Sequence, residues 1–331
     1  KKYEKDKSIP KKTIAAQELF ADLLKERAET GRIYIMNIDH SNSHSSFKDK
    51  VSMSNLCQEI TLPTTPIKSI DDPEGEIALC ILSAINVGAI GNLSELEGLC
   101  DLSVRALDEI IELQDYPVKA AEVSTKSRRS LGIGYIGLAH YLAKNGVKYS
   151  DPKAWELVDR LSEAFQYYLL RASCDIAEEK GKCSAFDRTK YADGLMPIDH
   201  YKKEVDEIVV HKQRMAWETL RKDILKYGLR HSTLSAQMPS ESSSVVSNET
   251  NGIEPPRALL SIKKSKKGPL KQIVPGFPNL KNAYTLLWDM GGNEGYIKIV
   301  SVMQKYFDQA ISGNWSYNPL QCETNEVPLL F

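Results

Sequence analysis

Residues 53–63 read Met-Ser-Asn-Leu-Cys-Gln-Glu-Ile-Thr-Leu-Pro, which places an amide, a thiol and a carboxylate at the alternate positions Asn55, Cys57 and Glu59. Residues two apart share a face of an extended chain, so these three groups can point at one ligand. A straight strand would nevertheless separate Asn55 from Glu59 by about 13 Å, at roughly 3.3 Å per residue. We therefore expect this segment to curl at the tip of a loop.

The composition around this segment is that of a globular protein, with 331 residues of which 42% are hydrophobic and 26% are charged. A formal net charge of -1 argues against a global electrostatic attraction to nucleic acid or to an anionic membrane. No apolar run approaches the roughly 18 to 20 residues of a spanning helix, and the first residues lack the apolar core of a signal peptide. These features predict a cytoplasmic protein with no direct contact to membrane or nucleic acid.

Six cysteines are spread along the chain, at positions 57, 80, 100, 174, 183 and 322. No Cys-x-x-Cys pair occurs, which disfavours a zinc site or a secreted disulfide scaffold. Most of these cysteines are expected to be buried or reduced thiols. The chain starts without Met and ends on the apolar run 327–331, so we expect it to be a fragment of a longer protein.

Helical spacing of apolar residues recurs along the chain and predicts helices over residues 14–29, 94–113, 152–180, 217–227 and 294–311. In the second of these, Ser94 and Glu97 match a capping box, with Leu96, Leu99, Leu107, Ile110 and Ile111 on the apolar side. In the third, Asp151-Pro152 is typical of a helix start, and Trp155, Val158, Phe165, Leu169, Ala172 and Ile176 are expected to face inward.

Two short segments have the composition of strands, residues 32–38 and 232–238. Residues 40–56 are polar and turn-rich and predict a loop that leads into the tip. The chain shows no repeat and no low-complexity linker, which favours one mixed α/β unit.

A serine-rich turn at residues 239–244 follows the second of these strands and opens a helix. Free backbone N–H groups and the helix dipole favour an anion there, so the turn fits a nucleotide phosphate. The equally plausible alternative is that Ser240 only caps the helix. The polar turn at 251–257 can line the same cleft.

Gly132, Gly134 and Gly137 match the glycine spacing of a dinucleotide-binding loop, which would indicate a nicotinamide-dependent enzyme. That interpretation requires a buried strand before the glycines, whereas residues 123–129 are polar and basic. We expect these glycines to allow close helix packing instead, and we expect no binding of NAD.

Three further features have ordinary explanations. His40 and His44 are four residues apart, yet the serines and the asparagine between them favour a loop over a metal site. The basic stretch 263–268 is typical of a solvated turn. Cys57 taken alone would be interpreted as a buried loop cysteine. A conventional cysteine nucleophile needs a nearby histidine or other base. The neighbours of Cys57 are instead an amide and a carboxylate, which suit a substrate that bears hydroxyls.

Taken together, five motifs resemble the catalytic large subunit of class I aerobic ribonucleoside-diphosphate reductases: residues 54–59, 75–80, 128–134, 238–243 and 251–257. Their order matches that family along essentially the whole chain. The resemblance implies that Cys57 forms a thiyl radical that removes the 3′ hydrogen of a ribonucleotide, that Glu59 takes the 3′ hydroxyl proton, and that Asn55 orients the sugar. It makes Cys80 one of two cysteines that form a disulfide during reduction.

The resemblance also makes Glu241, Ser242 and Ser243 the phosphate-binding turn. It implies an α/β fold, part of a ten-stranded barrel of two antiparallel five-stranded halves around a central finger loop that carries the radical cysteine. Residues 1–331 would be the C-terminal portion of this barrel domain, with the N-terminal half and the C-terminal tail absent.

The same resemblance implies that no cofactor or metal is bound directly, because a metal-containing small subunit supplies the radical. The expected partners are that subunit, the remaining segments of the large subunit, a ribonucleoside diphosphate, and thioredoxin or glutaredoxin. The isolated chain is expected to be inactive. The alternative is a non-catalytic fragment that acts as an assembly or regulatory partner of a reductase.

Overall fold

The first residues of the chain form a unit of their own. The computed structural model describes residues 2–210, 212–265, 268–316 and 318, and its contacts divide the chain into the two units Lys1–Asn37 and Ile38–Phe331. In the first unit, α1 spans Lys2–Lys5 and α2 spans Ala16–Thr30, ending at Gly31 as expected with a left-handed φ of 65°. Residues 32–37 form no strand, contrary to prediction, because no described strand pairs with them.

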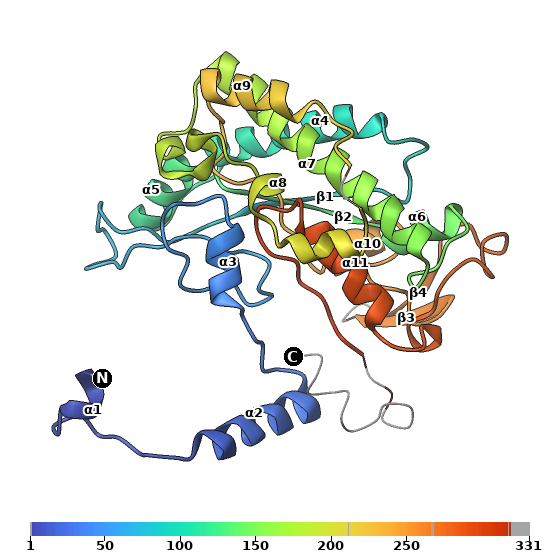
Figure 1. Ribbon diagram of the computed structural model, residues 1–331, viewed down its shortest axis with the longest axis horizontal. Helices are drawn as coiled ribbons and strands as arrows, with labels where there is room; N and C mark the ends of the chain where they lie inside the picture. The colour runs from blue at the N-terminus through green and yellow to red at the C-terminus, as the bar shows by residue number, and fades with distance from the viewer. Residues whose placement is uncertain (1, 211, 266–267, 317, 319–331) are drawn as a thin grey trace. The chain divides into compact units, whose positions relative to one another are not determined.

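The second unit contains the remaining elements, in the order α3 (Ile38–His44), β1 (Ile81–Asn86), α4 (Glu95–Leu113), α5 (Lys119–Arg128), β2 (Leu131–Ile136), α6 (Leu138–Lys144), α7 (Pro152–Lys180), α8 (Pro197–His200), α9 (Trp217–Tyr227), α10 (Glu241–Val246), β3 (Leu260–Ser265), β4 (Gly268–Ile273) and α11 (Glu294–Gln304) (Figure 1). Short 3₁₀ helices lie at Phe186–Arg188, Lys190–Asp193, Lys203–Glu207 and Leu287–Asp289. The predicted helices are confirmed, although α11 ends earlier than expected, and α3 occupies part of the predicted loop 40–56. No described helix is both long and apolar enough to cross a bilayer.

The described strands form two small sheets within a mixed α/β unit. β1 and β2 pair in parallel, from Ile81 opposite Leu131 to Asn86 opposite Ile136, and β3 and β4 form an antiparallel hairpin. The predicted extended segment 232–238 runs beside β2, since the backbone N–H of Ile133 donates to the Leu234 carbonyl at 2.8 Å. The segment 232–238 thus lies parallel to β2 as a third extended segment beside the β1–β2 pair.

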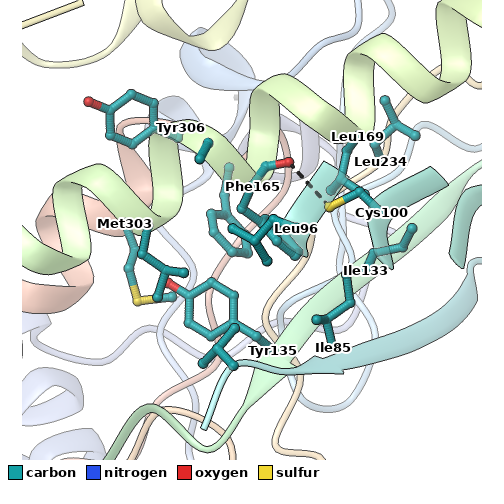
Figure 2. Close-up of a cluster of buried hydrophobic side chains, with 14 of the residues drawn as sticks. Ile85, Leu96, Cys100, Ile133, Tyr135, Phe165, Leu169, Leu234, Met303 and Tyr306 are labelled. Atoms are coloured by element: carbon teal, nitrogen blue, oxygen red, sulfur yellow. Dashed lines mark hydrogen bonds between the residues drawn. The ribbon is translucent and has the colours of Figure 1, made fainter. Parts of the chain in front are cut away.

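The hydrophobic core lies where α4 packs against α7 and β1 (Figure 1). Figure 2 shows side chains from α4, α7 and both strands of the parallel pair meeting there, with the Cys100 thiol donating to the Phe165 carbonyl oxygen at 3.9 Å. All the predicted core positions of α7 are buried except the half-buried Trp155. On α4, Leu99 and Ile110 are exposed rather than buried, because the inward face is completed by Cys100 and Val104, which the pattern did not include.

The start of α4 differs from the predicted capping box. Ser94 makes no side-chain cap hydrogen bond. The Glu95 carboxylate instead accepts from the backbone N–H groups of Gly91 and Asn92, at 2.9 and 3.1 Å. The capping-box motif at Ser94 therefore located the start of the helix correctly. The hydrogen bonds at this helix start are made by the Glu95 carboxylate, not by the Ser94 side chain.

Gly132 and Gly134 lie inside the buried strand β2, not at a helix contact, so that prediction was wrong. A Cβ added to Gly132 would lie 2.8 Å from Cys80 Sγ, and one added to Gly134 would lie 2.6 Å from the Ala236 carbonyl oxygen. Both distances are too short for real atoms. The glycines allow β2 to approach Cys80 on one side and the segment 232–238 on the other.

Candidate active site

The tip segment curls as predicted. The backbone N–H of Asn55 donates to the Ile60 carbonyl at 3.3 Å, and the backbone N–H of Ile60 donates to the Asn55 side-chain oxygen at 3.2 Å. Gln58 takes a left-handed φ of 66° within this turn. The Asn55 oxygen therefore holds the turn closed, while its exposed side chain leaves the amide N–H groups available to a ligand.

Cys57 and Glu59 lie on the two sides of Gln58. Cys57 is half-buried, and burial together with the nearby Glu59 carboxylate raises the pKa of its thiol. A thiol held in its protonated form is a poor nucleophile, but it still carries the S–H bond that hydrogen-atom chemistry requires. Glu59 is only 3% exposed, and its Oε2 has no hydrogen-bond partner among the described residues. That buried oxygen is free to accept a proton.

Cys80 lies directly before β1 and brings a second thiol to the same place. Burial raises the pKa of Cys80 to about 12, a hydrogen bond from Gln309 opposes that rise, and the carboxylates of Asp308 and Glu59 add to it. The Glu59 carboxylate thus disfavours the ionised form of both thiols. A Cβ on Gly132 would also lie 3.2 Å from Ile60 Cδ1, which places the tip loop beside Cys80.

A segment after α11 fastens the tip to the rest of the site. The backbone N–H of Ala310 donates to the Glu59 carbonyl at 3.1 Å, and the Ala310 carbonyl accepts from the backbone N–H of Gln237 at the same distance. The Gln309 side-chain oxygen accepts from the backbone N–H of Thr61 at 3.2 Å. Sequence reasoning missed Gln309, because these residues were included in the predicted last helix.

Asp308 was missed as well. Its buried carboxylate accepts hydrogen bonds from the side chains of Thr233, Ser235 and Tyr191 and from the backbone N–H groups of Leu234 and Ser235. Burial raises the pKa of Asp308, and these donors oppose that rise. The carboxylate fixes the segment 232–238 beside β2, and that segment continues into the serine-rich turn.

The serine-rich turn begins α10 but is not closed by a side-chain cap. Ser240 adopts a left-handed φ of 53°, makes no cap hydrogen bond, and leaves its buried Oγ without a partner in the described part of the chain. The capping alternative for Ser240 is therefore wrong. The side chains of Glu241, Ser242 and Ser243 are exposed, and the first N–H groups of a helix have no acceptor within it. This arrangement leaves donors available to an anion.

The polar turn 251–257 lies against this turn, as expected. A Cβ on Gly252 would lie 3.3 Å from the Pro239 carbonyl oxygen, and the Ser244 hydroxyl donates to the Asn251 side-chain oxygen at 3.5 Å. The structure thus brings the two polar turns together at the end of the extended segment.

The remaining candidates carry no site in the described part of the chain. His40 and His44 lie on helix α3, not in a loop, and His44 Nε2 makes a 2.8 Å hydrogen bond with the Phe307 carbonyl oxygen. No group of three or more metal-ligating side chains occurs among the described residues. The basic stretch 263–268 belongs to the β3–β4 hairpin, with positions 266 and 267 outside the described residues, as is Cys322.

Known proteins resemble the chain along nearly its whole length. The ribonucleotide reductase barrel domain matches residues 1–327. Ribonucleoside-diphosphate reductase subunit alpha of Buchnera aphidicola is 56% identical over 99% of this chain and 43% of its own length. Reductase 1 subunit alpha of Escherichia coli is 54% identical over 99% of this chain and 44% of its own, and the phage T4 subunit alpha is 41% identical over 98% and 43%. The chain therefore spans less than half the length of these relatives.

Proposed function

Because the chain belongs to the barrel-domain family of ribonucleotide reductases, we propose that it reduces ribonucleoside diphosphates to 2′-deoxyribonucleoside diphosphates by a thiyl-radical mechanism, as part of a larger assembly. The observation that carries this proposal is that the loop tip bearing Cys57 and Glu59 lies beside Cys80, with Gln309 in contact with both. The buried Oε2 of Glu59 has no hydrogen-bond partner among the described residues. We further propose that the tip is the central finger of a ten-stranded α/β barrel with two antiparallel five-stranded halves, to which β1, β2 and the segment 232–238 contribute.

The proposed reaction begins at Cys57. Its sulfur radical takes the 3′ hydrogen atom of the ribose, so that a C–H bond breaks and an S–H bond forms. Glu59 accepts the proton of the 3′ hydroxyl, and the amide N–H groups of Asn55 orient the sugar hydroxyls. The 2′ hydroxyl leaves as water after it has gained a proton from a thiol of the cysteine pair that includes Cys80, and Glu59 later returns its proton to the 3′ oxygen. These roles agree with the raised pKa of the Cys57 thiol and with a Glu59 Oε2 that has no hydrogen-bond partner in the described part of the chain.

Two electrons are still needed, and Cys80 supplies them together with a second cysteine. The two thiols become a disulfide as the sugar is reduced, and the 3′ hydrogen then returns from Cys57 to carbon, which regenerates the radical. A thioredoxin or glutaredoxin reopens the disulfide by thiol exchange. The second cysteine is assigned to the remaining segments of the alpha subunit.

The diphosphate is assigned to the start of α10. Backbone donors near Glu241, Ser242 and Ser243 and the Ser242 hydroxyl can hold phosphate oxygens there. The Ser243 hydroxyl, which donates to the Ser240 carbonyl oxygen at 3.3 Å, can turn to do the same. A small subunit with its own metal would supply the radical, so no cofactor is assigned to this chain. We assign the reaction to the cytoplasm.

The test combines the chain with the remaining alpha segments, the small subunit and a dithiol reductant, and measures deoxyribonucleotide formation from a ribonucleoside diphosphate. The parent chain should support turnover in this assembly. Cys57→Ser should abolish it, while Cys174→Ser, at a buried cysteine of α7, should retain it. Product formation by Cys57→Ser, or unchanged stimulation of an intact reductase by that variant, would favour the assembly-partner alternative. Turnover by the isolated chain would contradict the need for partners.

A further inference from the structure

Gln309 contacts three separate parts of the site at once. It is 3% exposed and lies on the segment that follows α11. Its Nε2 donates to the Leu131 carbonyl oxygen at 2.9 Å and lies 3.7 Å from Cys80 Sγ, while its Oε1 accepts from the backbone N–H of Thr61 at 3.2 Å. The carboxamide therefore joins β2, the Cys80 thiol and the tip loop.

The two backbone contacts decide which way the carboxamide faces. A backbone N–H can only donate, so the atom beside Thr61 must be the oxygen, and a carbonyl can only accept, so the atom beside Leu131 must be the nitrogen. One N–H of that nitrogen is consequently turned toward Cys80 Sγ. The thiol hydrogen of Cys80 must then point away from Gln309.

Strand β2 also approaches the Cys80 sulfur, at Gly132. A Cβ on Gly132 would lie 2.8 Å from Sγ, so the sulfur fits only because residue 132 is glycine. Two carboxylates act on the thiol, those of Asp308 and Glu59, and both disfavour its ionised form. Gln309 supplies the hydrogen bond that favours it.

We propose that Gln309 is a positioning residue for Cys80, which it holds against the tip loop while its N–H stabilises the thiolate. The redox role of Cys80 rests on the function proposed above, but the Gln309 contact does not. Thiol exchange depends on the thiolate, so this contact bears on how readily a Cys80 disulfide forms and reopens.

The test measures alkylation of Cys80 by iodoacetamide in the full polypeptide that carries this chain, with each cysteine followed by mass spectrometry. Gln309→Met removes the N–H at similar volume. Because a charge-assisted hydrogen bond contributes to thiolate formation, the alkylation rate at about pH 8 should fall about tenfold, and the pH profile should move to higher pH.

Gln304→Met is the matched control. Gln304 donates to the carbonyl oxygens of Phe307 and Gln309, at 3.3 and 2.7 Å, and so supports the same segment. Its loss should change the Cys80 rate by less than about twofold, since no N–H to sulfur is removed. A second variant, Gln309→Glu, keeps the acceptor for Thr61 and should also slow alkylation.

The sign of the change separates positioning from packing. Loosened packing alone would expose the sulfur and speed alkylation without moving the pH profile. A rate in Gln309→Met that is unchanged, faster, or matched by Gln304→Met would overturn the proposal. In the reconstituted reductase, Gln309→Met should lower kcat and leave KM unchanged. Failure of turnover in every sample would count against the proposed function alone, because alkylation requires no turnover.

Discussion

The thiol region and the serine-rich turn differ in how much of the protein surrounds them. The thiol region, defined by the tip loop 53–62 with Cys80, is fastened by the buried side chain of Gln309 and the backbone of Ala310. The serine-rich turn 239–244 presents exposed side chains at the start of α10. The first region is built to fix geometry, and the second is open to a ligand that must enter and leave.

Two glutamines fasten these regions to opposite ends of β2. Gln309 contacts Leu131 at the strand's start, while Gln237 accepts from the backbone N–H of Tyr135 at 3.0 Å and donates to its carbonyl at 2.9 Å. Gln237 also donates to the carbonyl of Met238 at 3.0 Å, just before the turn. Four residues of strand span roughly 13 Å, so β2 acts as the spacer between the thiols and the turn.

The glycines of β2 offer the strongest way to break this arrangement. Gly134→Ala should lower the free energy of unfolding by about 2–3 kcal/mol, because its Cβ would meet the backbone carbonyl of Ala236, which cannot rotate away. Urea unfolding of the full polypeptide would measure the loss. Equal stability of the variant and the parent would show that the segment 232–238 is not held as tightly as its contacts indicate.

Gly132→Ala serves as the matched comparison at the other end of the strand. Its Cβ would meet the side-chain ends of Cys80 and Leu82, at 2.8 and 2.7 Å, and these can turn aside. The unfolding free energy should fall by no more than about 1 kcal/mol. Deoxyribonucleotide formation should nevertheless be lost, because the thiol is displaced. Full activity of this variant would mean that the position of Cys80 does not limit the reaction.

The serine-rich turn should respond in the opposite way, with a change in substrate binding and little change in stability. Ser242→Asp places a negative charge where a diphosphate is proposed to bind, so the KM for the nucleotide should rise about tenfold. An acid in the first turn of a helix is not destabilising, so the unfolding free energy should stay within about 0.5 kcal/mol of the parent.

The control for this variant lies at the other end of α10. Ser247 is exposed at the C-cap, and Ser247→Asp adds the same charge away from the helix start. Its KM should remain close to that of the parent in steady-state kinetics of the reconstituted assembly. Equal KM values in both aspartate variants would show that the phosphate does not bind at the serine-rich turn.

Local patterns predicted the local features of this molecule. Apolar spacing and helix-end signals located α4, α7 and α9, and the alternation at 55, 57 and 59 predicted the curled tip. Position 33 and its neighbours have strand-like composition, but a strand requires a pairing partner, and a short sequence window does not contain one. β2 was missed because its glycines resemble a loop unless the close neighbours on both sides are known.

Distant contacts explain what was missed at the site. Gln309 meets Thr61 across 248 positions of sequence and Cys80 across 229, and no local pattern marks a single glutamine after a helix. Asp308 is likewise an isolated acid whose hydrogen-bond donors are brought together only by the fold. The curl of the loop tip was predictable from the sequence, whereas the groups that hold the tip in place were not.

The smallest expected effect is on the reactivity of Cys57, when one carboxylate is removed either from the thiol region or from the polar turn 251–257. Burial is the larger cause of the raised Cys57 pKa, and the Glu59 carboxylate is the second. Glu59→Gln removes that carboxylate, so the pKa of the Cys57 thiol should fall. Below that pKa a lower value means more thiolate, and alkylation of Cys57 at about pH 8 should become about threefold faster. The difference should disappear at pH values above both thiol pKa values.

Glu254→Gln, in the polar turn 251–257, provides the control. The Glu254 carboxylate accepts from the side chain of Asn314 at 2.7 Å, and glutamine keeps an acceptor there. Its substitution should leave the alkylation of Cys57 unchanged, because the Cys57 pKa responds to Glu59 and not to this turn. If both variants alkylate at the parent rate, the Glu59 carboxylate does not act on Cys57, and its proposed role as the proton acceptor beside that sulfur loses its electrostatic support.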